Sequence, residues 1–166
     1  DAEVVDEHGR ALPFGAEGRL RVRAPWAPKG YAGRADADRF RDGWFYPGDL
    51  AVLGPDRRIK LVGRSDDLIN RGGIKIVPEA IESVLMAHPE VKDAAVVGVA
   101  DRIAGEVPAA FVVLRNAAAL EVLHAFCAER MHEIRIPVGF IALPEIPRSP
   151  EGKVLRAQLR NLVRAR

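Results

Sequence analysis

The sequence of 166 residues contains one cysteine, Cys127, and no long apolar run. A single cysteine excludes a disulfide framework and most cysteine-based metal sites, and it favours a cytoplasmic location. The apolar runs are short and interrupted by charge, which predicts no membrane span. The net charge of +2, from 25 basic and 23 acidic residues, is too small to indicate a partner such as nucleic acid.

Histidine is also scarce, and its four copies show no metal-ligand spacing with the cysteine or with paired carboxylates, so we expect no metal site. Hydrophobic residues make up 48% and charged residues 29%, as in a globular protein. The length suggests one domain or two small ones, at roughly 100–200 residues each. The chain starts at Asp1 without a leader, in the middle of what looks like a sheet, so we expect part of a longer protein.

The first part of the chain, residues 1–62, has the pattern of short strands and turns. Residues 49–53 and 58–62 are apolar runs on either side of a Gly-Pro-Asp-Arg turn, which predicts a hairpin. The polar residues 36–42 favour a short helix. One strand alternates strictly, with Leu20 and Val22 on one face and three arginines, Arg19, Arg21 and Arg23, on the other. We predict a small antiparallel β-subdomain over residues 1–65.

The remaining residues, 66–166, mix strands with helices. Pro78 occupies a first helical position, and Ile81 and Leu85 follow at helical spacing. The other expected elements are strands at 91–100, 107–114 and 138–143 and helices at 117–131 and 154–163. We therefore predict the α+β fold class, with a compact C-terminal domain in which helices pack on a sheet.

Two carboxylates and an arginine are candidates for a site in the first part. Gly48 allows a tight turn and leaves Asp49 at the start of a strand, where its carboxylate can accept hydrogen bonds from a diol such as ribose. Arg64 can bind a phosphate or a ribose oxygen, and Asp66 lies where the two parts meet, as a hinge residue would. The alternatives are a turn aspartate bound to nearby N–H groups and a surface salt bridge.

Two loops in the second part are also candidates. Gly72 and Gly73 lie between two apolar runs, where they allow a ligand or another backbone to approach closely, although two glycines at such a place usually form a simple hairpin turn. Lys153 follows a loop and precedes a helix, an arrangement that can deliver a cation to a developing anion. The alternative is a solvated lysine. The glycine spacing is not that of a phosphate-binding P-loop.

Four segments, taken in order, resemble the C-terminal part of the adenylate-forming ligases, which include acyl-CoA synthetases, peptide-synthetase adenylation domains and luciferase. They are residues 18–31 (GRLRVRAPWAPKGY), 42–50 (DGWFYPGDL), 63–82 (GRSDDLINRGGIKIVPEAIE) and 147–156 (PRSPEGKVLR). They are distributed in this order over nearly the whole chain, which would be only the last part of a family member several times longer. The resemblance implies an enzyme that uses Mg²⁺ and ATP to convert a carboxylic acid into an acyl-adenylate, and that then forms a thioester with CoA.

The resemblance also implies a role for each candidate residue. Asp49 would bind the ribose hydroxyls with support from Arg64, and Asp66 would be the hinge of a mobile C-terminal domain. Lys153 would be the catalytic residue of adenylation, stabilising charge on the carboxylate and the α-phosphate. After a rotation at the hinge, the loop of Gly72 and Gly73 would line the tunnel for the thiol.

The sequence departs from the family pattern at two positions. Pro47 stands where Thr or Ser usually precedes Gly-Asp, and Ala80 replaces the first Glu of an E-I-E stretch, which leaves Glu82 as a structural residue. In the family, the phosphate loop, the acyl and adenine pockets and the magnesium ligand would lie upstream of Asp1. We therefore expect an AMP-forming ligase as the full-length parent and no activity from this chain alone.

Other acceptors and another class of protein stay open at this point. CoA is preferred because no carrier-domain serine motif follows Lys153, and the nearest alternative is an acyl-AMP ligase or adenylation domain that loads a carrier protein. A non-catalytic docking domain is the alternative from a different class. Its partner would bind a basic strip on the last helix, formed by Arg156, Arg160, Arg164 and Arg166.

Overall fold

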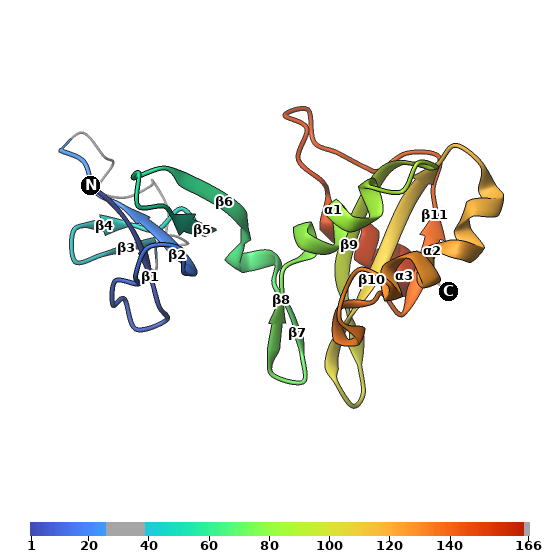
Figure 1. Ribbon diagram of the computed structural model, residues 1–166, viewed down its shortest axis with the longest axis horizontal. Helices are drawn as coiled ribbons and strands as arrows, with labels where there is room; N and C mark the ends of the chain where they lie inside the picture. The colour runs from blue at the N-terminus through green and yellow to red at the C-terminus, as the bar shows by residue number, and fades with distance from the viewer. Residues whose placement is uncertain (26–38, 165–166) are drawn as a thin grey trace. The chain divides into compact units, whose positions relative to one another are not determined.

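The computed structural model describes residues 1–25 and 39–164, and the chain divides into two compact units, Asp1–Asp66 and Asp67–Arg166 (Figure 1). The boundary falls next to Asp66, at the start of the second expected domain. Residues 26–31 of the first family-like segment and residues 36–38 of the expected helix lie outside the described residues. Each unit is described by itself.

The first unit is one antiparallel sheet in which β3, β4, β2, β5 and β6 are neighbours in that order, and β1 pairs with β2. Its strands are β1 (Ala2–Val5), β2 (Glu17–Val22), β3 (Phe40–Arg41), β4 (Trp44–Phe45), β5 (Asp49–Leu53) and β6 (Ile59–Arg64). The 3₁₀ turn η2 (Ser65–Asp67) follows β6. The helix expected at 36–42 is wrong for residues 40–41, which instead pair with β4 as strand β3.

The alternation in β2 gives this sheet two different faces. Leu20 packs with Val4 and Ala51 in a buried apolar cluster on one face. On the other face, the guanidinium groups of Arg21 and Arg23 each lie 4.4 Å from the centre of the Trp44 ring. The arginines therefore cover an aromatic ring through cation–π contacts while their charged ends remain hydrogen-bonded.

The second unit is a five-stranded sheet with helices packed on it. The strands are β7 (Ile69–Arg71), β8 (Ile74–Ile76), β9 (Val91–Asp101), β10 (Gly105–Leu114) and β11 (Gly139–Ala142), and the helical segments are α1 (Pro78–Met86), η3 (Ala117–Val122), α2 (Leu123–Ala128), η4 (Glu133–Arg135) and α3 (Arg156–Arg164). The neighbour order is β11, β10, β7, β8, with β9 paired to β10. Only the pair of β10 with β11 is parallel among the described strands. The predicted α+β class is thus confirmed.

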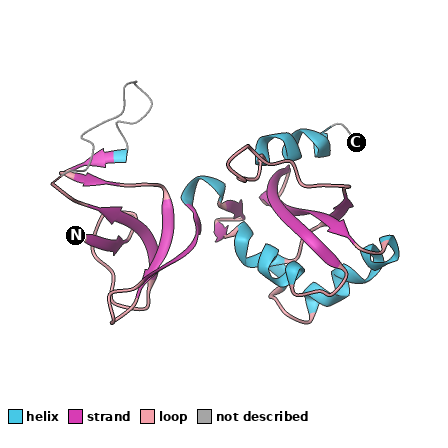
Figure 2. Cartoon of the chain, turned by 90° about the horizontal axis from the view of Figure 1, so that it is seen from above, coloured by secondary structure: helices cyan, strands magenta, loops and turns pink. Residues whose placement is uncertain are grey.

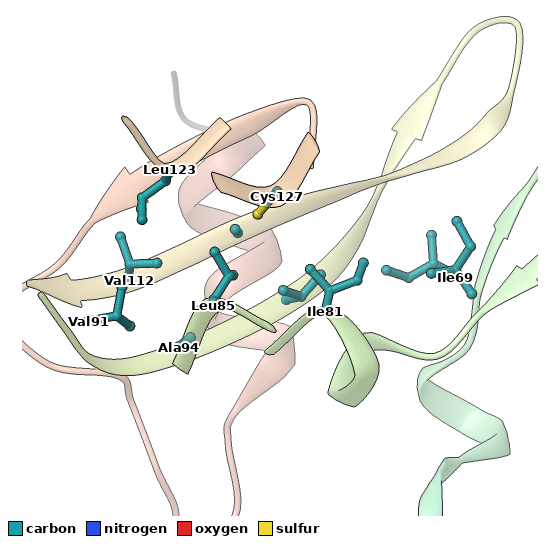
Figure 3. Packing of buried hydrophobic residues seen from close by; sticks show 11 residues of the cluster. Ile69, Ile81, Leu85, Val91, Ala94, Val112, Leu123 and Cys127 are labelled. Atoms are coloured by element: carbon teal, nitrogen blue, oxygen red, sulfur yellow. The ribbon is translucent and has the colours of Figure 1, made fainter. Parts of the chain in front are cut away.

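Both faces of this second sheet are buried. Ile81 and Leu85 of α1 and Leu123 of α2 form one apolar cluster on the first face (Figure 3). Leu159 of α3 and Ile146 form a second cluster with strand residues on the other face. Figure 2 shows α3, which runs toward the C-terminus, across the strands from the remaining helices. The continuous helix predicted over residues 117–131 is instead a 3₁₀ segment followed by the short helix α2.

No helix within residues 1–25 and 39–164 is long and apolar enough to cross a membrane.

The single thiol lies in the apolar cluster that α1 and α2 form with the sheet of the second unit. Cys127 is fully buried, and burial raises its pKa to about 11, although the nearby positive charge of Arg130 opposes this shift. Because the thiolate is the reactive form, we expect alkylation by iodoacetamide at pH 8 to be at least about 100-fold slower in the folded chain than in urea. Mass spectrometry of the single adduct measures both rates. Similar rates in the two states would contradict the packing of α2 described here.

Candidate functional site

A corner between β5 and β6 brings Asp49 and Arg64 together. Asp49 is the first residue of β5, and its register partner is Arg64, the last residue of β6. The Nη1 atom of Arg64 donates to Oδ1 of Asp49 at 3.2 Å, and Nη2 donates to the carbonyl oxygen of Pro47 at 3.4 Å. Antiparallel pairing therefore fixes a carboxylate beside a guanidinium, with both side chains partly exposed.

Gly48 determines the shape of this corner. Its φ of +86° lies in the region that side chains disfavour, and a Cβ atom there would lie 3.2 Å from Nη2 of Arg64. The Gly48 carbonyl accepts hydrogen bonds from Ser65, from the backbone N–H at 2.8 Å and from Oγ at 3.1 Å. We call Pro47, Gly48, Asp49, Arg64 and Asp66 the Gly48 corner.

Asp66 belongs to the same corner through two arginines. Its Oδ2 accepts a hydrogen bond from Nη2 of Arg39 at 3.2 Å and lies 3.6 Å from Nη2 of Arg64. Arg39 also donates to the Pro47 carbonyl at 2.9 Å. Sequence reasoning missed Arg39, because it lies 27 residues from Asp66 in a stretch that has no motif.

Lys153 lies on a short hairpin, which we call the Lys153 hairpin (residues 148–154). Arg148 and Val154 pair as an antiparallel bridge, and the N–H of Gly152 donates to the carbonyl of Ser149 at 2.8 Å. Figure 1 shows this hairpin extending from the sheet of its own unit. The Lys153 side chain is exposed, and its charge interacts with Glu151 two residues earlier.

Arg148 anchors the base of the Lys153 hairpin to the sheet. The Nη2 atom of Arg148 donates to both carboxylate oxygens of Asp93 on β9, at 2.8 and 2.9 Å. The Nη1 atom of Arg148 donates to the Gly152 carbonyl at 3.0 Å. At the tip, a hydrogen bond from the Ser149 hydroxyl lowers the pKa of Glu151. The positive charge of Lys153 also lowers this pKa, so the exposed cation lies near an acidic residue on an anchored hairpin.

Gly72 and Gly73 form the turn between β7 and β8, and their φ values are +57° and +87°. The N–H of Gly72 donates to the Ala104 carbonyl at 2.7 Å, and the N–H of Gly73 donates to Oδ1 of Asn70 at 3.0 Å. No atom lies within 4 Å of where a Cβ would be at either glycine. The turn is thus ordered, and the space before it is open.

A surface hollow of about 330 Å³ lies beside this turn and is lined by Arg71, Gly72, Ala104, His132, Glu133 and Ile134. Within the second unit, Figure 1 shows the β7–β8 turn and the Lys153 hairpin at opposite ends. The structure therefore brings Asp49, Arg64 and Asp66 together in one unit, and places Gly72–Gly73 and Lys153 at separate points of the other.

Arg156 is buried, in contrast to the basic strip proposed for it. Its side chain is only 9% exposed and contacts Asp67, Glu79 and Glu82. It is therefore not available to an acidic partner, and the strip is wrong at its first position. Arg166 and the side chain of Arg164 lie outside the described residues.

Glu82 has the structural role expected of it. Its Oε1 accepts the N–H of Val96 at 2.8 Å and Nη1 of Arg156 at 2.6 Å. Burial alone would lower the pKa of Arg156, but its hydrogen bond with Glu82 and the charges of its acidic neighbours raise it above its ordinary value. Arg156 is therefore a permanent buried cation.

The side chains of His, Cys, Asp and Glu in the described part of the chain form no group of three or more that could hold a metal ion.

Comparison with known protein families gives a match over part of the chain. Residues 80–153 match the AMP-binding enzyme C-terminal domain family. This match, together with the relatives below, confirms the resemblance to the C-terminal portion of the adenylate-forming ligases that the four segments predicted.

The individual relatives include CoA ligases. The chain is 40% identical over 161 residues to a 2-succinylbenzoate–CoA ligase of Bacillus mycoides, a match that covers 96% of this chain and 34% of that protein. Among solved structures, it resembles o-succinylbenzoate CoA synthetase of Bacillus subtilis in complex with its acyl-adenylate intermediate, with 34% identity, a TM-score of 0.86 and coverage of 96% and 33%.

The ATP-bound MatB of Rhodopseudomonas palustris is similar at 32% identity, with a TM-score of 0.89 and coverage of 98% and 33%. The chain thus spans about a third of the length of the proteins it matches.

The geometry of the Gly48 corner predicts that replacing Gly48 destabilises the first unit. We expect Gly48→Ala to lower the free energy of unfolding by about 1–3 kcal/mol, because alanine is strained at this φ and its Cβ would crowd Arg64. Urea denaturation followed by tryptophan fluorescence measures the change. Gly43→Ala is the matched control, since its φ of +77° is similar but no atom lies within 4 Å. An equal loss in both variants would mean that Arg64 does not pack against residue 48.

Proposed function

We propose that this chain is the C-terminal portion of an ATP-dependent carboxylate–CoA ligase. The parent enzyme would convert a carboxylic acid and ATP into an acyl-adenylate and pyrophosphate, and would then transfer the acyl group to CoA. The names of the relatives support this proposal, because the 2-succinylbenzoate–CoA ligases are similar to nearly all of this chain. They also suggest 2-succinylbenzoate as the first carboxylic acid to test.

One observation carries the proposal: the exposed ammonium group of Lys153 stands on a hairpin that Arg148 anchors to β9. A surface lysine without a role needs no rigid support, whereas a cation that must reach developing negative charge does. We propose that Lys153 enters the nucleotide site during adenylation and stabilises charge on the carboxylate and the α-phosphate. Its side chain is exposed and therefore free to enter a site formed by other parts of the protein.

The Gly48 corner supports a role in nucleotide binding. Asp49 has one oxygen bound by Arg64 and remains partly exposed, so its carboxylate is able to accept hydrogen bonds from the two hydroxyls of a ribose. Arg64 holds that carboxylate in place and presents further N–H donors toward ribose or phosphate oxygens. We assign ribose binding to this pair.

We assign the hinge to Asp66. It is the last residue of the first compact unit, and its side chain is more than half exposed. Surface ion pairs such as those with Arg39 and Arg64 contribute little, about 0–1 kcal/mol each, so they can be exchanged during a rotation. We propose that residues 1–65 belong to the large domain and that residues 66–166 form the mobile domain.

The β7–β8 turn is the proposed thiol-facing element. Its two glycines leave open space where side chains would stand, which suits the passage of an extended pantetheine arm. The proposed acceptor is CoA, and a carrier protein bearing the same arm is the alternative.

The ATP of the proposed reaction is accompanied by Mg²⁺ in such enzymes. The described residues do not supply a ligand set for magnesium, so we assign no residue of this chain to it. We retain a cytoplasmic location as a prediction from the single, buried cysteine.

The role of Lys153 predicts an asymmetric effect of Lys153→Ala in the full-length ligase. We expect the rate of adenylation, measured by pyrophosphate release, to fall by at least about 10², because the stabilising cation is lost. Acyl transfer to CoA from supplied acyl-adenylate should stay within about twofold. Lys92→Ala, at an exposed lysine in the same unit, is the control. Equal losses in both half-reactions would show that Lys153 is misassigned.

The role of the β7–β8 turn predicts the opposite asymmetry. Asn tolerates the left-handed φ of residue 72, so Gly72→Asn adds bulk with little backbone strain. We expect acyl transfer to CoA to fall roughly tenfold while adenylation is unchanged, because a side chain would obstruct the thiol. The control is Gly15→Asn, at a glycine that also has positive φ and open surroundings. Unchanged transfer would remove this turn from the thiol path.

A further inference from the structure

Among the residues that the structure describes, Arg156 is the one buried charged side chain, and all three of its guanidinium nitrogens contact a partner. Nη1 donates to Oε1 of Glu82 at 2.6 Å and to the Val96 carbonyl at 2.7 Å. Nη2 donates to Oε1 of Glu79 at 2.9 Å, and Nε lies 3.2 Å from Oδ2 of Asp67. We call these residues the Arg156 cluster.

The partners of Arg156 come from distant parts of the sequence. Asp67 is the first residue of the second unit and directly follows Asp66. Glu79 and Glu82 lie on α1, and Val96 lies on β9. Arg156 itself begins α3, three residues after Lys153. The cluster therefore joins the segment that follows the proposed hinge to the segment that carries the proposed catalytic lysine.

Stability alone does not explain this cluster. Three carboxylates surround one guanidinium, Oε2 of Glu79 is buried without a hydrogen-bond partner, and burial raises the pKa of Glu79. A buried ion cluster of this kind is often no more stabilising than apolar packing. The cluster instead fixes the relative orientation of its members, because a planar guanidinium fixes the angles as well as the distances of its partners.

The Lys153 hairpin is thereby held at both ends. Arg148 binds Asp93 of β9 on one side of Lys153, and Arg156 binds the Val96 carbonyl of the same strand on the other. Leu159, one turn further along α3, is fully buried against the sheet. Asp67 is the remaining contact, and it lies on the segment next to the hinge.

We propose that Arg156 is a positioning residue, which links Asp67 to the Lys153 hairpin so that rotation at Asp66 moves Lys153 as part of one rigid body. The inference rests on the proposed function, in which Lys153 must reach the nucleotide. A displacement of about 1 Å can cost a reaction up to about 100-fold in rate. Independent movement of the hinge segment and Lys153 would therefore lower the rate of adenylation and not the rate of acyl transfer.

The test uses Asp67→Ala and Arg156→Lys in the full-length ligase. Asp67→Ala leaves Arg156 with Glu79 and Glu82, so no buried charge loses its last partner. We expect both variants to lower the kcat of adenylation roughly tenfold, with the KM for ATP and the rate of transfer from supplied acyl-adenylate within about twofold. The matched controls are Glu145→Ala, at an exposed acid of the same unit, and Arg160→Lys, one turn along α3.

A merely structural role gives a different result. In that case adenylation and transfer fall by the same factor, together with the melting temperature, and this outcome would overturn the proposal. Unchanged adenylation in Asp67→Ala would overturn it as well. If Arg156→Lys does not fold, Asp67→Ala carries the test alone, since it preserves the buried pairs.

Hydrogen exchange separates this inference from the proposed function. In Asp67→Ala we expect the amide of Leu155, which donates to the Pro147 carbonyl, to exchange roughly tenfold faster. The amide of Leu143, which donates to the Val112 carbonyl, should be unchanged. If Leu155 exchanges faster but Lys153→Ala slows both half-reactions equally, the link through Arg156 is retained and the proposed role of Lys153 is rejected. If exchange at Leu155 is unchanged but Lys153→Ala slows only adenylation, the proposed role of Lys153 is retained and the link through Arg156 is rejected.

Discussion

The antiparallel ladder between β9 and β10 is the constraint on which the second unit depends. Ala94 and Val96 point to the face covered by α1 and α2, while Ala95 and Val97 point to the face covered by α3. Because successive side chains alternate, a slip of one residue would exchange the two faces and misplace every helix contact. The ladder also sets the position of Asp93 and of the Val96 carbonyl, which anchor the Lys153 hairpin.

Within each unit, arginines connect the candidate residues to the neighbouring backbone. Arg64 joins Asp49 to the Pro47 carbonyl, Arg148 joins Asp93 to the Gly152 carbonyl, and Arg156 joins three carboxylates to a strand. In each case one guanidinium binds both a carboxylate and a backbone oxygen. A lysine presents a single charged point and could not hold two partners at fixed angles. The site is thus supported by directional contacts more than by apolar packing.

Local patterns were sufficient to predict much of the fold. The alternation in β2 and the first turn of α1 after Pro78 depend on neighbouring residues, and the structure confirms both. The helix expected at 36–42 was wrong for residues 40–41 because pairing with β4 overrode a polar composition. Helical spacing places Arg156 with Arg160, which led to the prediction of an accessible basic strip. The burial of Arg156 depends on Glu79 and Glu82, more than 70 residues earlier, and no periodicity reveals such partners.

For the proposed ligase, which would handle activated acyl groups, the position of Cys127 has a consequence. A mixed anhydride such as an acyl-adenylate reacts with any accessible thiolate, including one on the protein that made it. This chain has one sulfhydryl, enclosed between helix and sheet and held in its protonated form at neutral pH. The lobe that would escort pantetheine to the intermediate therefore carries no competing nucleophile of that kind, and self-acylation on sulfur is suppressed by packing alone.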